Sequence, residues 1–239
     1  MAVKYAIPQV KLEVKPRELE FVTAKDIRDL INYAHRFQTF QKKEAVKREG
    51  RDMLEHFTFI AFIIGKQKAA EEAGFEYWGM EPNDFPLLEK IRGEFYRDFN
   101  RLIDDIAAEK NLDGVKVAKY LRRSDLIAQM AVWKAFNFGK VALWDDEAFK
   151  RRTFIPVKKE KLAEQRYKYE GKFMFRSEAD DLVCDFCGPL SGKLADDPYD
   201  LEVPPLHPNC RCMIVGIPTV KVYDKQTRFA KKFEAEEEE

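Results

Sequence analysis

All four cysteines of this chain and one of its three histidines fall within a single short stretch, and thiolates and imidazoles together are typical zinc ligands. Cys184-x-x-Cys187 comes first, and after a spacer of nineteen residues follows an H-x-x-C-x-C run formed by His207, Cys210 and Cys212. The C-x-x-C half predicts a tight turn with both sulfurs on one side. The second half can return further ligands from the far end of the loop. A closed structural zinc site takes four ligands, so we expect one of the five candidates to be a neighbour of the metal and not a ligand.

The spacing ranks the five candidate ligands. Cys184 and Cys187 are the surest pair, because the turn between them brings their sulfurs together. We expect His207 to be the third ligand, since the flanking prolines restrict its backbone and fix its ring. For the fourth place, Cys210 has the commoner H-x-x-C spacing, whereas Cys212 is better anchored at the start of a strand. The sequence leaves that choice open.

Three other interpretations of the cysteines compete with zinc. An even count allows disulfides, but the amino terminus lacks the uninterrupted apolar segment of a signal peptide, and cytoplasmic thiols are normally reduced. Proteins of hyperthermophiles are an exception, and the high Lys and Glu usage keeps it open. A thioredoxin-like redox pair lacks a surrounding βαβ pattern, and chance clustering of free thiols is disfavoured by the short span. Under zinc or disulfides alike, the cysteines have a structural role.

The same stretch resembles a known family. The segments 180–187 (DDLVCDFC), 190–192 (LSG) and 204–212 (PPLHPNCRC) are similar to the phage Mu F-like head morphogenesis family, the minor head proteins of tailed phages and related proviruses. The closing string, at this distance from the C-x-x-C, carries most of the specificity. A weaker match extends upstream through 135–140 (AFNFGK), so the resemblance covers residues 125–218. The chain departs from the family at 130–133, where it reads MAVW in place of an Arg-Thr-Glu-like start.

The resemblance implies a role in virion assembly. A member of this family is expected to be a minor capsid protein in the capsid interior. It is expected to bind the portal protein and other head proteins at the portal vertex, and to assist head assembly and DNA packaging or ejection. Assembly would take place in the host cytoplasm. Packaged DNA is a further candidate partner, although the basic clusters at 116–123 and 151–161 suit solvated helix faces better than a phosphate-binding surface.

The sequence gives no sign of an enzyme. It contains no nucleophile elbow, Walker loop, Gly-rich dinucleotide turn or H-E-x-x-H motif. A metal-dependent nuclease would need a second histidine near His207, but His35 and His56 lie far away in the chain and suit ordinary helix positions. The zinc deaminase pattern fails because no Glu follows His207 at the required spacing. We therefore expect no catalytic residues and no small-molecule substrate. A zinc-dependent nucleic-acid-binding or nuclease-like protein is the alternative.

Composition predicts a globular chain without a strong field. Of the 239 residues, 45% are hydrophobic and 13% aromatic, which argues against disorder. Lys and Arg number 42, as do Asp and Glu, so nothing steers the whole chain towards nucleic acid or acidic lipid. The charged fraction of 35% exceeds the usual quarter, as in thermophile proteins. No apolar run is long enough to span a membrane, and we expect no membrane partner.

The order of patterns predicts an α+β fold: an amino-terminal helical bundle, followed by a small mixed module stapled by the Cys/His zinc site. Four regions are expected: an extended arm over 1–22, the helical bundle over 23–144, the Mu F-like module over 145–223 and a charged tail over 224–239. Val10, Leu12 and Val14 suggest an edge strand in the arm. Helices are expected over 23–50, with Thr23 as a cap and Gly50 as a break, and then over 52–73, 84–110, 115–121 and 124–144, the last capped by Ser124. Strands are expected over 153–157, 172–175 and 213–217, with helical turns possible within 158–168.

Overall fold

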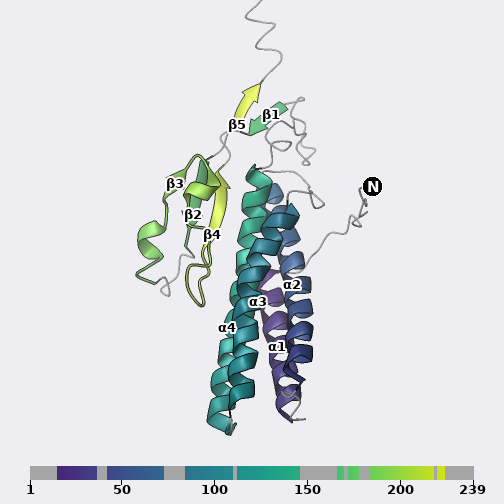
Figure 1. Cartoon of the computed structure of the whole chain (residues 1–239). Helices are drawn as coiled ribbons and strands as arrows, with labels where there is room; N and C mark the ends of the chain where they lie inside the picture. Colours follow the sequence, from purple (N-terminus) through teal and green to yellow (C-terminus); the bar gives the residue numbers. More distant parts are fainter. Residues whose placement is uncertain are drawn as a thin grey trace, which may run out of the picture.

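Four long helices come first in the chain and short strands follow, so the fold is α+β (Figure 1). The structure, a computed structural model, describes residues 15–36, 42–72, 84–109, 112–145, 166–169, 172–177, 184–217 and 220–223. Within these ranges no helix combines the length and the apolar character that a membrane crossing requires.

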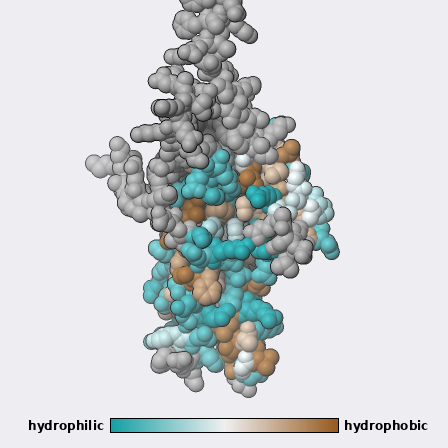
Figure 2. Space-filling view, turned by 180° about the vertical axis from the view of Figure 1, so that it is seen from behind, coloured by the Kyte–Doolittle hydropathy of each residue, from teal (hydrophilic) through white to brown (hydrophobic). Residues whose placement is uncertain are grey.

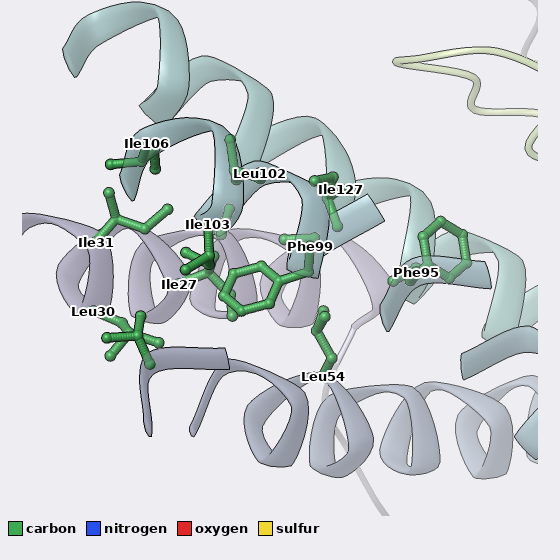
Figure 3. Packing of buried hydrophobic residues seen from close by; sticks show 14 of the residues in the cluster. Ile27, Leu30, Ile31, Leu54, Phe95, Phe99, Leu102, Ile103, Ile106 and Ile127 are labelled. Carbon is green, nitrogen blue, oxygen red and sulfur yellow. The ribbon is translucent and has the colours of Figure 1, made fainter. Parts of the chain in front are cut away.

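The helices α1 (Pro16–Arg36), α2 (Lys43–Glu72), α3 (Asp84–Ala108) and α4 (Gly114–Asp145) run side by side along one axis (Figure 1). Apolar residues recur every three or four positions and turn one face of each helix inwards. Figure 3 shows the result in one half of the bundle, where side chains from all four helices meet. The labelled residues of this cluster are Ile27, Leu30, Ile31, Leu54, Phe95, Phe99, Leu102, Ile103, Ile106 and Ile127.

The first helix begins earlier than the sequence predicted. α1 begins at Pro16, whose fixed φ and missing N–H suit the first turn of a helix. The carboxylate of Glu18 accepts a hydrogen bond from the Lys15 N–H at 3.4 Å. The Thr23 hydroxyl does not cap a helix, because it donates to the Leu19 carbonyl oxygen at 2.6 Å inside α1. Residues 16–22 of the expected extended arm are thus helical, and its expected edge strand lies outside the described residues.

Gly50 does not break a helix, contrary to the expectation from sequence. α2 continues through it, and a Cβ atom built at this position would lie 2.1 Å from a ring carbon of Phe99. The glycine therefore makes room for an aromatic ring of α3 against the α2 backbone. The missing side chain is a packing feature, which a single sequence cannot separate from a helix-breaking signal.

The expected helices over 115–121 and 124–144 are one helix. α4 begins at Gly114, next to the break expected over 111–114, and runs without interruption to Asp145. Ser124 was expected to cap the second helix, but its hydroxyl donates to the Leu121 carbonyl oxygen at 2.7 Å within α4. A serine whose hydroxyl bonds back to the preceding turn is compatible with a helix interior.

α2 and α4 cross with their backbones in direct contact. A Cβ atom on Gly65 would lie 2.0 Å from the Phe136 carbonyl oxygen, and one on Gly139 would lie 2.1 Å from the Phe62 carbonyl oxygen. Only glycine leaves space for this approach. The crossing fixes α4 close to α2 just before α4 reaches the strands.

Two small antiparallel sheets follow the bundle. β2 (Lys172–Arg176) lies between β3 (Leu194–Ala195) and β4 (Met213–Ile217), while β1 (Arg166–Tyr169) pairs with β5 (Val220–Tyr223). The strands expected over 172–175 and 213–217 are therefore confirmed. Residues 166–168, where helical turns were considered, are in strand β1, where two tyrosines alternate with basic residues in a strand-like pattern. The strand expected over 153–157 and the charged tail lie outside the described residues.

The three-stranded sheet shares a core with the end of the bundle. Trp144 of α4 packs edge-on against Phe173 of β2, with ring centroids 5.9 Å apart. Their cluster combines residues of α2, α4, the sheet and the cysteine loop: Ala69, Ala70, Val141, Leu143, Trp144, Phe173, Phe175, Cys187, Leu201, Cys210, Cys212 and Ile214. On the outside, Figure 2 shows hydrophilic residues over most of the described surface, with apolar ones in small separate groups. Packing thus fixes the position of the cysteine loop relative to the helices.

Candidate metal centre

A buried asparagine on α4 anchors the end of the cysteine loop. The Asn137 side chain is fully buried and donates to the carbonyl oxygens of Trp133 at 3.0 Å and Cys212 at 3.4 Å. Its Oδ1 accepts the Ile214 N–H at 3.2 Å. One amide therefore satisfies two backbone groups of the loop and strand β4, on the strand edge away from β2. This clamp holds Cys212 against the bundle.

The C-x-x-C segment forms the predicted turn. The N–H groups of Cys187 and Gly188 both donate to the Cys184 carbonyl oxygen, at 3.1 and 2.9 Å. The Cys187 N–H also lies 3.3 Å from the Cys184 sulfur. Backbone N–H groups directed at this sulfur, that of Cys187 above all, lower the pKa of the Cys184 thiol. The turn thus favours the thiolate, the form that binds a metal.

The H-P-N-C segment turns the histidine towards the sulfurs. The Cys210 N–H donates to the His207 carbonyl oxygen at 3.1 Å, and Asn209 has a φ of 60°, a left-handed conformation that asparagine tolerates. The His207 Nδ1 lies 2.8 Å from the Pro208 carbonyl oxygen. Because a carbonyl can only accept, this contact assigns the proton to Nδ1. The lone pair of Nε2 is then free to bind a metal.

Distances between the ligand atoms are close to those of a tetrahedral zinc site. With ordinary zinc–sulfur and zinc–nitrogen bonds, two sulfurs lie about 3.8 Å apart, and a sulfur and a nitrogen about 3.6 Å. The Cys187 and Cys210 sulfurs are 3.9 Å apart. The His207 Nε2 lies 3.0 Å from the Cys184 sulfur and 3.1 Å from that of Cys187. A small outward shift of the imidazole would bring these two distances to the zinc value, so the residues fit the ion.

The structure brings all five predicted site residues together, in two overlapping groups. Cys184, Cys187 and His207 form one, and Cys187, Cys210 and Cys212 form the other, with the ligand atoms of each group within 4.8 Å of one another. Cys187 belongs to both and is the centre of the site. All four cysteines are free thiols, so none of the disulfides considered from the sequence is present. The cluster has the geometry to hold a metal ion.

Burial determines the electrostatics of the inner thiols. Burial, followed by hydrogen bonds with neighbouring cysteines, raises the pKa of the Cys187 thiol. Burial and the charge of neighbouring Cys210 raise the pKa of Cys212 to about 11. At neutral pH these thiols are therefore protonated unless a cation compensates their thiolates, and metal binding would release their protons.

The remaining histidines lie apart from this cluster. His56 packs its ring edge-on against Phe57, with centroids 5.4 Å apart, and His35 is half-buried on α1. In the described part of the chain, the only groups with metal-ligand geometry are the two that share Cys187. Both histidines occupy the ordinary helix positions expected from sequence.

Sequence reasoning missed two kinds of functional or structural residue. Asn137 was noted only as part of a weak motif match, although a lone amide within an apolar helical run is a signal for a buried polar contact. The buried ion pairs Lys140–Glu72, with 2.7 Å between Nζ and Oε1, and Lys66–Asp84 were not expected either. Partners so far apart in sequence cannot be paired without the fold.

No protein-family model, curated protein or solved structure shows significant similarity to the chain. The family resemblance therefore rests on the motif residues alone.

Proposed function

We propose that Cys184, Cys187, His207 and Cys210 hold one structural zinc ion, with Cys212 as a close neighbour. The support is geometric: the Cys187–Cys210 sulfur distance fits a shared metal, and Nε2 of His207 faces two sulfurs with its lone pair. The ion would cross-link the two ends of the loop. Cys212, whose carbonyl oxygen is bound by Asn137, then serves to fix the strand at the bundle.

We propose further that the protein is a minor head protein of a tailed phage or provirus. It would bind portal and other head proteins at the portal vertex inside the capsid, after assembly in the host cytoplasm, and assist head assembly and DNA packaging or ejection. The motif that resembles the Mu F-like family supports this assignment.

The observation that carries the proposal is the position of the motif in the fold. The residues that form the resemblance are those of the cysteine loop, and this loop shares its core with α2 and α4. Three of the four thiols are buried, at 1–5% exposure, so this half of the site faces packed side chains and not a substrate cleft. A Cys-rich, buried donor set is typical of structural metals. Such a loop serves binding by presenting a fixed surface, without chemistry of its own.

Co-assembly with the portal protein tests the function. The portal gene nearest to this one would be co-expressed with the wild-type chain, with Cys187→Ser, and with Ser191→Ala as a control in the same loop outside the site. We expect the portal to co-purify with wild type and control, and to be lost with Cys187→Ser. Divalent-dependent DNA cleavage that disappears in His207→Ala, together with no portal binding, would instead support the nuclease-like alternative.

A further inference from the structure

A groove lies between α1, α4 and the loop of the metal centre. Its volume is 490 Å³, within the range of about 300–1,000 Å³ that is usual for ligand sites. One wall is formed by α1 residues between Arg17 and Arg28, and a second by α4 residues between Asp125 and Trp133. Residues of the segment 205–211 form the third wall. We call this the α1–loop groove.

The lining of the α1–loop groove is net cationic. It contains Arg17, Lys25, Arg28 and Arg211 but only two carboxylates, so its formal charge is +2. Both carboxylates already have partners within the chain. Asp125 is paired with the Arg28 guanidinium, and Glu20 accepts a hydrogen bond from the Trp133 indole N–H at 2.6 Å. The charge that remains for a partner is therefore positive, and it attracts an acidic group.

The groove also has an apolar rim. Phe21 lines it with 72% of its surface exposed, the second-largest exposure among the large hydrophobic residues of the described chain. Met130, Trp133 and Pro205 add apolar surface to its walls. An aromatic side chain held on a helix in this way gains free energy when a partner covers it, by about 25 cal/mol for each Å² removed from water.

The acceptors in the lining distinguish between two acidic partners. Glu20, Asp125 and the side-chain oxygen of Gln129 line the groove together with the cations, and Gln129 Oε1 has no hydrogen-bond partner among the described residues. Carboxylates repel a phosphodiester chain, whereas acceptors suit the N–H groups of a peptide backbone. We propose that the α1–loop groove binds an acidic peptide segment of a partner protein, with an apolar residue of the peptide over Phe21 and its carboxylates beside Lys25 and the arginines.

The site loop makes this groove dependent on the metal centre. Cys210 and Arg211 belong both to the third wall and to the segment between the histidine and the last cysteine. A loop fixed at its ends holds the Arg211 side chain at the groove. The inference concerns the class of ligand and does not require the phage assignment.

Selection from random peptides tests the ligand class. The full-length protein would be incubated with a library of random ten-residue peptides, and the most enriched peptide would be titrated with a fluorescein label by fluorescence polarisation. We expect Asp or Glu to be enriched next to a Leu, Met or aromatic residue. No such enrichment would overturn the proposal.

Two surface variants test the location. Lys25→Glu reverses one charge of the groove and Phe21→Ser removes its apolar rim, while Lys119→Glu makes the same charge change on an exposed part of α4 outside the groove. Since all three positions are exposed, circular dichroism should be unchanged. We expect each groove variant to weaken binding about tenfold and the control to leave it unchanged. Equal affinity of Lys25→Glu and Lys119→Glu would refute the groove. Competition by a labelled DNA duplex with the same variant dependence would show a phosphate-binding surface instead.

Discussion

Asn137→Leu is the change that tests most sharply how the loop is held on the bundle. The leucine has a similar volume but cannot hydrogen-bond, so the Ile214 N–H and the Cys212 carbonyl oxygen lose their partner in a fully buried place. Each buried backbone group left unpaired costs about 1–3 kcal/mol. The bond to the Cys212 oxygen is long at 3.4 Å and counts at the low end. We therefore expect a loss of about 2–4 kcal/mol in the free energy of unfolding.

Urea unfolding measures this loss, followed by tryptophan fluorescence and far-ultraviolet circular dichroism together. Asn100→Leu is the matched control, because it makes the same replacement on α3, where the side-chain oxygen Oδ1 has no hydrogen-bond partner among the described residues. We expect the control to change stability by less than about 1 kcal/mol. The metal affinity of Asn137→Leu should also fall, by about tenfold, as is usual when a group that orients a metal site is lost. If both variants were equally stable, the clamp would have no energetic role.

Further predictions concern the interior of the bundle. Gly65→Ala should destabilise the protein by more than about 3 kcal/mol, because its Cβ would meet the Phe136 carbonyl oxygen at 2.0 Å, whereas Gly93→Ala, with open space around it, should stabilise α3 by up to about 1 kcal/mol; thermal melts compare them. Glu72→Leu should cost about 3–5 kcal/mol because it leaves the fully buried Lys140 without its partner, while the double variant with Lys140→Met should recover most of this loss in urea titrations. Burial lowers the pKa of Lys140, so its folded form binds fewer protons than its unfolded form at pH values between the folded and the ordinary pKa. Wild-type stability should therefore rise with pH as that window is crossed, relative to Lys140→Met, and a parallel pH dependence of the two would contradict this.

The sequence predicted the parts of the fold that depend on local pattern. Helical spacing of apolar residues identified the bundle, and the apolar run that follows Cys212 identified β4 with its correct ends. The C-x-x-C and H-x-x-C spacings identified five residues that the fold brings together. In each of these cases, the signal and the structure depend on neighbours within a few residues.

The errors arose where a distant contact decides the outcome. Gly50 carries the same local signal as a helix break, and only the Phe99 ring of another helix explains it. Thr23 and Ser124 are good caps by type, but their hydroxyls bond back to the preceding turn of continuous helices. The role of Asn137 depends on a strand that follows it by more than seventy residues. Such pairings cannot be derived from one sequence, because they arise from packing.

Counting zinc in the purified protein tests the central claim most directly. Native mass spectrometry of the full chain, purified without added metal, should show one zinc ion per molecule, and its removal with a chelator should lower the melting temperature. Cys187→Ser should lose the ion entirely, because this residue belongs to both ligand groups. His207→Ala should lose it as well; zinc retained there but lost in every single cysteine variant would show four thiolate ligands. Metal-free protein with two intact disulfides would contradict the account.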